Sequence, residues 1–172
     1  MSGKNIVLVG FMGTGKSSVG KALAKKLNKV FVDVDLLIEQ KEKKKIQDIF
    51  QEKGEAYFRE LEKNVIREVS ENDNAVITTG GGAVLNVENL DNLKKRGVLV
   101  ALLASAETIY ERVKHSKHRP LLNNSESMLT EIKNLLQVRQ PYYQKADFSF
   151  DTDGQTPYEV ADKVAEKLKN IL

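Results

Sequence analysis

The feature that most constrains the fold of this chain is a glycine-rich segment between a short apolar run and a helical pattern. The segment reads Gly-Phe-Met-Gly-Thr-Gly-Lys-Ser over residues 10–17 and follows the aliphatic run Ile6–Val9. Val19, Leu23 and Leu27 then recur at helical spacing. The glycines therefore stand where a buried strand turns sharply into a helix, which is the start of a β-α unit.

The spacing of the same segment, G-x-x-x-x-G-K-S, predicts a phosphate site. Backbone N–H groups of such a loop converge on an anion, and the following helix adds a partial positive charge. Lys16 would reach the β- and γ-phosphates of a nucleoside triphosphate, and the Ser17 hydroxyl would bind Mg²⁺. A glycine-rich turn without a ligand is the alternative, which the flanking strand and helix disfavour. We expect the nucleotide to contact Gly13, Thr14, Gly15, Lys16, Ser17 and Ser18.

Composition excludes several other classes of protein. The chain has 172 residues, of which 41% are hydrophobic and 30% charged, and this fits one domain with a full-sized core. It has no cysteine, so disulfides and thiolate metal sites are excluded. The net charge of +3 is too small to indicate a nucleic-acid partner but suits anionic small molecules. The longest apolar run, Val98–Ala104, has the length of a strand. We expect a cytoplasmic protein without nucleic-acid or membrane partners.

Strand-like runs alternate with helical patterns along the chain. The strand-like runs are Ile6–Val9, Val30–Val32, Ala75–Thr78, Val98–Leu103 and Asp147–Phe150. The helical patterns cover Phe58–Val69, Asn89–Lys95, Ala106–Lys114, Ser125–Gln140 and Val160–Leu168. Continuous aliphatic runs favour strands that are buried on both faces, as in a parallel sheet covered by helices. The sequence therefore predicts an open, doubly wound α/β fold.

Three further segments have local signatures. Thr156–Glu159 is a capping box with proline at the first helical position, which predicts a helix start. Leu36–Gly54 indicates short helices inserted above the sheet, with Lys41–Lys45 as a solvent face. The basic segment Lys114–Pro120 lacks apolar periodicity and indicates a mobile flap, for which a solvated connecting loop is the alternative.

Polar and glycine residues follow the ends of two predicted strands, where ligands bind in open α/β sheets. Asp33 and Asp35 follow the second strand, and Gly80–Gly82 follow the third. The third strand ends in Thr78-Thr79 rather than an acid, so Asp33 is the nearest candidate to hold Mg²⁺, through water. The two aspartates would point the same way if the chain stays extended; capping of the next helix is the alternative.

Two arginines are candidates for binding an acidic substrate. Arg59 lies on a helix whose apolar stripe faces inward, and Arg139 lies near the end of the long predicted helix. Each arginine alone would most often be a surface residue or part of an ion pair. Two planar guanidinium groups at one crevice would match a carboxylate bidentately.

Taken in order and spacing, these motifs resemble the shikimate kinase family over nearly the whole chain. The matching segments are residues 10–20, Phe31–Asp35, Phe58–Glu62, Thr79–Gly82, Arg119–Leu122 and Arg139–Tyr143. The resemblance implies a three-layer α/β/α P-loop kinase fold with a five-stranded parallel sheet. It also implies a single kinase domain over residues 1–172, with a substrate-binding insertion at about 34–61 and a mobile lid at about 112–124.

The reaction implied by the resemblance is ATP-dependent phosphorylation of the 3-hydroxyl of shikimate. The products would be shikimate 3-phosphate and ADP, in aromatic amino acid (chorismate) biosynthesis, with Mg²⁺ as cofactor and a monomeric enzyme. Asp35 would hold the reacting hydroxyls and take or orient the proton. Arg59 and Arg139 would grip the carboxylate, and the backbone of Gly80, Gly81 and Gly82 would support the ring.

The nucleotide side of the site is also implied by the resemblance. Lys16 and Arg119 would stabilise the transferring phosphoryl group, with Arg119 arriving on the lid. Asp33 would order the water shell of Mg²⁺ beside Ser17, and the loop that contains Gln155 would lie against the adenine. The catalytic set is therefore expected to be Lys16, Asp35 and Arg119.

Three other functions share part of this pattern. A gluconate or nucleoside monophosphate kinase would have the same phosphate loop and lid, but the acidic, arginine and glycine motifs together favour a polyhydroxylated carboxylate as acceptor. A GTP-dependent switch needs N-K-x-D after a strand, whereas Asn28-Lys29 is followed by Val30-Phe31. A non-catalytic binding module descended from a kinase is disfavoured because Lys16, Ser17, Asp35 and Arg119 are all present.

Overall fold

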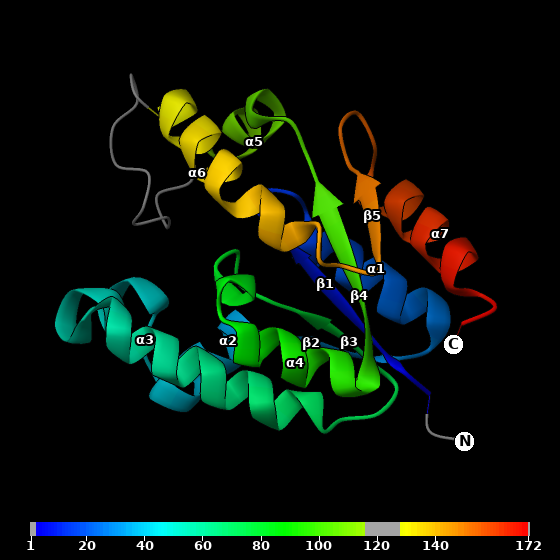
Figure 1. Cartoon of the computed structure of the whole chain (residues 1–172), viewed down its shortest axis with the longest axis horizontal. Helices are drawn as coiled ribbons and strands as arrows, with labels where there is room; N and C mark the ends of the chain where they lie inside the picture. Colours follow the sequence, from blue (N-terminus) through cyan, green and yellow to red (C-terminus); the bar gives the residue numbers. More distant parts are fainter. Residues whose placement is uncertain (1–2, 116–127, 172) are drawn as a thin grey trace.

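The structure is a computed structural model that describes residues 3–115 and 128–171. Its described part contains a five-stranded parallel sheet with helices on both faces (Figure 1). The three-layer α/β/α arrangement predicted from the sequence is confirmed. The motif Arg119–Leu122 and most of the predicted lid lie outside the described residues.

The order of the strands in the sheet is β2-β3-β1-β4-β5. Their bounds are β1 Asn5–Gly10, β2 Val30–Asp33, β3 Ala75–Thr78, β4 Gly97–Leu103 and β5 Phe148–Asp151. The central strand β1 pairs with β3 and β4, with Ile6 opposite Val76 on one side and Val98 on the other. Because all the pairs are parallel, the carboxyl ends of the strands meet at one edge of the sheet.

The helices divide between the two faces of the sheet. They are α1 Lys16–Leu27, α2 Val34–Glu42, α3 Ile46–Ser70, α4 Val87–Arg96, α5 Ala106–Val113, α6 Met128–Tyr143 and α7 Pro157–Leu168, with the 3₁₀ turn η1 Ala83–Leu85. Helices α1 and α7 pack on one face, and α3 to α6 pack on the other (Figure 1). Val7 of β1 faces one core and Ile6 faces the other, as the two-residue period of a strand requires.

Strands with similar aliphatic sequences differ in burial according to their position in the sheet. β1 is buried along its whole length, whereas the edge strands β2 and β5 are only partly covered. Val30 at the start of β2 is 64% exposed. The expectation that each strand is buried on both faces is therefore wrong for the two edges, because an edge strand has a neighbour on one side only.

The element boundaries differ slightly from the predicted ones. Helix α4 starts earlier because the Asn86 side chain accepts a hydrogen bond from the Glu88 N–H. Strand β5 starts after Asp147, whose N–H donates to the Leu99 carbonyl at 2.9 Å while its carboxylate accepts the Leu99 N–H at 2.8 Å. The three-residue turn η1 gave no sequence signal because it is too short for a periodic pattern.

The predicted short helices of the segment Leu36–Gly54 are present as α2 and the first part of α3. α3 consists of two helical parts that meet at Gly54, where φ is 80° and ψ is 173°. That region of backbone space is open essentially to glycine alone. The bend at Gly54 turns the first part of α3 back over the carboxyl edge of the sheet.

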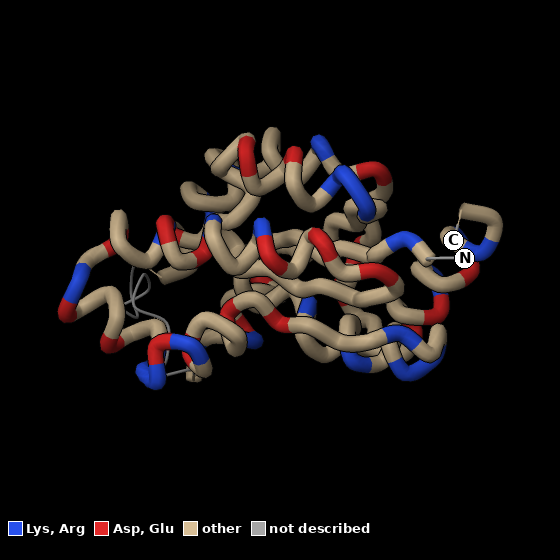
Figure 2. Tube along the Cα trace, turned by 90° about the horizontal axis from the view of Figure 1, so that it is seen from below, with Lys and Arg blue, Asp and Glu red and all other residues tan. Residues whose placement is uncertain are grey.

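Charged residues of both signs are interspersed along the outer helices, while the central strands carry few (Figure 2). Among the helices that the structure describes, none combines the length and hydrophobicity needed to cross a lipid bilayer.

Helix α7 begins with the predicted capping box. The Thr156 hydroxyl accepts the Glu159 N–H at 3.3 Å, and the Glu159 carboxylate accepts the Thr156 N–H at 2.7 Å. These bonds satisfy two donors that the helix start leaves unpaired.

We predict that Thr156→Ala lowers the free energy of unfolding by about 1 kcal/mol, because the N-cap acceptor is lost. Urea denaturation measures the change. Thr130→Ala, at an exposed position inside α6, is the control and should shift it by less than about 0.5 kcal/mol. Equal effects of the two substitutions would contradict a capping contribution.

Candidate active site

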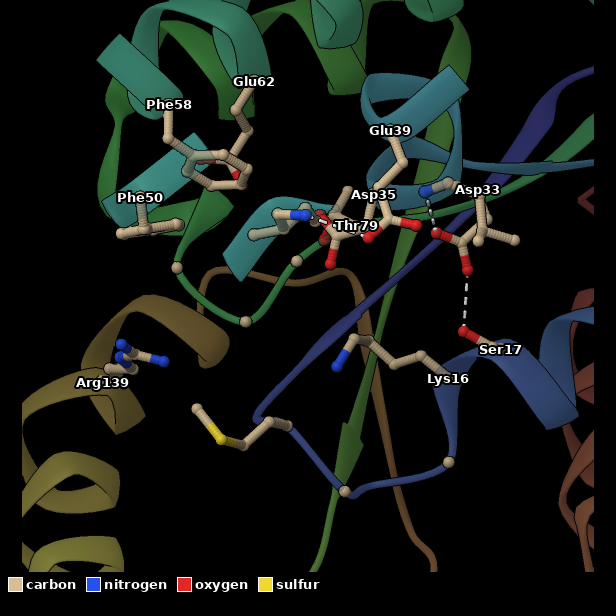
Figure 3. A pocket seen from close by; sticks show the side chains of 18 of the residues that line it. Lys16, Ser17, Asp33, Asp35, Glu39, Phe50, Phe58, Glu62, Thr79 and Arg139 are labelled. Carbon is tan, nitrogen blue, oxygen red and sulfur yellow. Dashed lines mark hydrogen bonds between the residues drawn. The ribbon is translucent and has the colours of Figure 1, made fainter. Parts of the chain in front are cut away.

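A cavity of about 660 Å³ lies at the carboxyl edge of the sheet. The phosphate loop forms one side, and α2, α3 and the glycine turn Gly80–Gly82 form the other (Figure 3). Arg139 of α6 closes a third side. The tertiary structure thus brings most of the sequence-predicted residues together around one space.

The backbone of the phosphate loop adopts conformations that favour glycine. Gly15, the N-cap of α1, has φ 92°, a left-handed conformation that glycine adopts at little cost. The Lys16 Nζ donates to the carbonyl oxygens of Gly10 and Phe11 at 2.9 and 2.8 Å, so the side chain folds across its own loop. Lys16 and the positive end of α1 therefore face the same part of the cavity.

Asp33 links the phosphate loop to α2. Its Oδ2 accepts the Ser17 hydroxyl at 2.8 Å, and its Oδ1 accepts the Leu36 N–H at 3.2 Å as the N-cap of α2. The helix starts at Val34, so the alternative in which the chain stays extended through Asp35 is wrong. Asp33 caps the helix, and Asp35 stands in its first turn.

Asp35 is a half-buried residue whose Oδ1 is buried. Its Oδ1 has no hydrogen-bond partner within the described residues. Burial raises the pKa of Asp35 to about 7, and the negative charges of Glu62 and Asp33 add to that shift, whereas Lys16 and Arg59 oppose it. An aspartate with such a pKa can accept a proton near neutral pH.

The backbone of the glycine turn lies in close contact with charged side chains, and a larger residue there would displace them. A Cβ on Gly80 would lie 3.0 Å from Asp35 Oδ1 and 3.1 Å from Glu62 Oε1. A Cβ on Gly82 would lie 2.7 Å from a guanidinium nitrogen of Arg59. The glycines therefore let the Asp35, Glu62 and Arg59 side chains approach the backbone of the turn as closely as they do.

Arg59 is held by two carboxylates of its own helix. Its Nη1 donates to Glu62 Oε2 at 2.8 Å, and its Nη2 donates to Glu55 Oε1 at 3.3 Å. Glu62 is 1% exposed, and its Oε1 has no partner in the described part of the chain. The site prediction omitted Glu62, although the F-R-x-x-E pattern contained it.

Arg139 approaches the glycine turn from α6. It is 6% exposed, and its guanidinium lies 5.3 Å from the centre of the Phe11 ring. Its Nη1 would lie 3.3 Å from a Cβ on Gly81. The Arg139 and Lys16 side chains extend toward the same space from opposite sides (Figure 3).

An apolar wall completes the acceptor side. The rings of Phe50 and Phe58 have centroids 4.7 Å apart, and both line the cavity (Figure 3). They come from the two parts of α3 on either side of Gly54. The bend at Gly54 therefore brings the two rings together.

Two of the predicted nucleotide-contact residues that the structure describes, Thr14 and Gln155, are not among the residues that line the cavity. Thr14 is buried, and its hydroxyl donates to the Phe11 carbonyl at 2.8 Å. The Gln155 amide donates to the Asp151 carbonyl at 2.8 Å. Arg119 lies outside the described residues. Arg112, which had no sequence signal as a site residue, lines the cavity and donates to Gly13 O at 3.1 Å and Thr152 O at 2.9 Å. It ties the loop before Gln155 to the phosphate loop.

We predict that Asp35→Asn raises the free energy of unfolding by roughly 1–3 kcal/mol at pH 8, because it removes a buried charge. The folded pKa of about 7 exceeds the ordinary value of 3.8, so the carboxylate destabilises the fold as pH rises through that interval. The stabilisation by Asp35→Asn should decrease as the pH falls from 7 to 4, and it should vanish below pH 4. Urea denaturation at pH 4 and pH 8 tests this.

The control for that experiment is Asp48→Asn, at an exposed position in the first turn of α3. It removes a carboxylate that is already solvated and should not stabilise the fold at pH 8. A gain for Asp35→Asn that is equal at both pH values would contradict the buried charge as its cause.

Curated relatives of this chain are named shikimate kinase. The protein from Thermodesulfovibrio yellowstonii is 50% identical over 168 residues, which cover 98% of this chain and 96% of the relative. The protein from Persephonella marina is 45% identical over 166 residues, which cover 96% and 99%.

Solved structures agree with the sequence relatives. The shikimate kinase from Acinetobacter baumannii in complex with shikimate has a TM-score of 0.93 at 37% identity, with 99% of this chain and 96% of that chain covered. A sugar kinase from Janibacter has a TM-score of 0.64 at 16% identity, with 97% and 95% covered, and shows a common fold alone. The predicted P-loop kinase fold is confirmed.

The family model described as shikimate kinase matches residues 12–169. Together with relatives at 45 to 50% identity over nearly the whole chain, this match shows that the chain belongs to the shikimate kinase family.

Proposed function

We propose that this chain transfers the γ-phosphoryl group of ATP to the 3-hydroxyl of shikimate, giving shikimate 3-phosphate and ADP in aromatic amino acid biosynthesis. The observation that carries the proposal is one cavity with a phosphate loop on one side and two arginines on the other. Asp35 lines the same cavity, and the positive charges of Lys16 and Arg59 both act to lower its pKa.

The acceptor side fits a ring with one carboxylate and several hydroxyl groups. Arg59 and Arg139 would hold the carboxylate, because planar guanidinium groups match it bidentately. The unpaired Oδ1 of Asp35 would accept a hydrogen bond from the reacting hydroxyl, which would supply its missing partner. The N–H groups of the turn Gly80–Gly82 would support the ring.

The donor side stabilises the phosphates of ATP. The loop N–H groups, the α1 terminus and Lys16 supply positive charge where negative charge accumulates during transfer. Arg119 would add a second cation from the lid that the sequence predicts at about residues 112–124. Closure of that lid would exclude water, which otherwise would compete with the acceptor for the phosphoryl group.

The residues beside the phosphate loop fit a magnesium ion. The Ser17 hydroxyl and the Asp33 carboxylate lie 2.8 Å apart, and both are oxygen ligands of the kind that Mg²⁺ prefers. Ser17 would bind the ion directly and Asp33 through water. When bound, the ion would neutralise charge on the β- and γ-phosphates.

The enzyme would act as a cytoplasmic monomer on small molecules. The described lining of the cavity includes both the phosphate loop and the two arginines, so a single chain supplies the nucleotide side and the acceptor side. Acidic and basic residues are interspersed along the described helices (Figure 2), and the net charge of +3 is small for a protein that binds nucleic acid.

A panel of acceptors tests the function directly. Purified protein with ATP and Mg²⁺ should phosphorylate shikimate, while gluconate and nucleoside monophosphates should remain unreacted. Chelation of divalent cations should abolish turnover. Phosphorylation of gluconate or a nucleotide, with shikimate unreacted, would overturn the proposal.

We predict that Arg59→Ala raises the KM for shikimate roughly 10- to 150-fold, which corresponds to loss of a charge-assisted hydrogen bond worth about 1.5–3 kcal/mol. The KM for ATP should change little, because Arg59 lies on the acceptor side of the cavity. Steady-state kinetics with each substrate varied in turn measures the split.

Arg67→Ala is the matched control, because Arg67 is exposed on the same helix and bonds only to Asn64 among the described residues. It should leave both KM values unchanged. Equal weakening of shikimate and ATP by Arg59→Ala would indicate that Arg59 acts through the fold.

A further inference from the structure

Helix α6 places a second buried side chain one turn beyond Arg139. Tyr143 lies four residues further along the same helix face and is 2% exposed. It belongs to the R-x-x-x-Y element that the sequence contains, of which the proposed reaction uses only the arginine. Arg139 lines the cavity, whereas Tyr143 is not among the lining residues.

Tyr143 reaches the glycine turn through its hydroxyl. The Tyr143 Oη donates to the carbonyl oxygen of Gly81 at 2.8 Å, across a separation of 62 residues in the chain. Burial raises the pKa of Tyr143 to about 12, although the neighbouring Arg139 opposes the shift, so the hydroxyl remains a donor at neutral pH.

The two other carbonyls of the turn are held by the backbone itself. Gly80 O accepts the Ala83 N–H at 3.2 Å, and Gly82 O accepts the Leu85 N–H at 3.1 Å. Only the middle carbonyl depends on a side chain from a distant helix. Within the described residues, the N–H groups of Gly81 and Gly82 have no protein acceptor.

The hydrogen bond to the Gly81 carbonyl also fixes the direction of the next N–H group, that of Gly82. The peptide between Gly81 and Gly82 is planar and trans, so its C=O and N–H point in opposite directions. With the carbonyl held by Tyr143, the Gly82 N–H points away from that ring, and Gly82 lines the cavity. Between two glycines such a peptide rotates easily, since no Cβ restricts it. A rotated peptide would turn a carbonyl oxygen toward the bound carboxylate and repel it.

We propose that Tyr143 is a positioning residue, whose hydroxyl holds the Gly81 carbonyl so that the turn presents the Gly82 N–H to the acceptor. The inference rests on the proposed function and specifies how its acceptor site is kept in order. A Cβ on Gly81 would lie 3.2 Å from the Met12 N, so the turn also abuts the phosphate loop. Its orientation therefore bears on the distance between acceptor and ATP.

Tyr143→Phe removes one oxygen atom and tests the inference. We expect the calorimetric Kd for shikimate to weaken roughly ten-fold, the effect of one lost hydrogen bond that leaves a carbonyl unsatisfied. The KM for shikimate should rise with it, while the Kd and KM for ATP should stay unchanged. Tyr142→Phe is the matched control, since it removes the same atom from a half-buried neighbour and should change neither ligand.

Calorimetry also separates positioning from folding. Partial unfolding of Tyr143→Phe would lower the binding stoichiometry and leave the Kd of the folded fraction unchanged, and that result would overturn the inference. Unchanged shikimate binding, or equal weakening of shikimate and ATP, would overturn it as well. The parent protein in the same assay tests the proposed function: no turnover of shikimate by the parent would overturn both, whereas normal parental turnover with an unaffected variant would overturn only the part assigned to Tyr143.

Discussion

The close contact between the glycine turn and buried charged groups is the constraint on which the rest of the site depends. Carboxylate oxygens of Asp35 and Glu62 and the guanidinium group of Arg59 all lie within about 3 Å of positions that a Cβ would occupy on Gly80 or Gly82. Backbone without side chains lets groups of opposite sign converge around one small volume. A substrate that enters this volume meets N–H groups, carboxylate oxygens and guanidinium groups at the same time.

That convergence is unfavourable for stability when the site holds no substrate. Asp35 Oδ1 and Glu62 Oε1 are buried and unpaired within the described residues, and burial raises the pKa of both carboxyl groups. A polyhydroxylated acceptor would supply the missing donors, so part of its binding free energy would come from relieving this penalty. The stability lost at such a site is the usual counterpart of a preorganised arrangement of charges.

The support for the site comes from elements that are distant in the chain but adjacent in space. The strand order β2-β3-β1-β4-β5 puts the ends of β1, β2 and β3 side by side, so the phosphate loop, Asp33 and the glycine turn become neighbours. Helix α6 then adds Arg139 and Tyr143 from the other side of the turn. Arg112 joins the phosphate loop to the loop after β5 in a similar way.

The sequence by itself determined the features that depend on local backbone: the phosphate loop, the capping box at Thr156, the alternation of strands and helices, and the family resemblance that pointed to Arg59 and Arg139. Local spacing encodes such features because their hydrogen bonds join residues a few positions apart. The sequence left open whether Asp33 extends the strand or caps α2. Its aliphatic runs also predicted the same burial for edge strands as for central strands. Only the tertiary structure decided that Asp33 caps the helix, that Glu62 and Arg112 belong to the site, and that Gln155 lies outside the cavity lining. Those outcomes depend on the order of the strands and the packing of the helices. Both bring together side chains that lie far apart in the sequence, so no local pattern of residues could reveal the contacts.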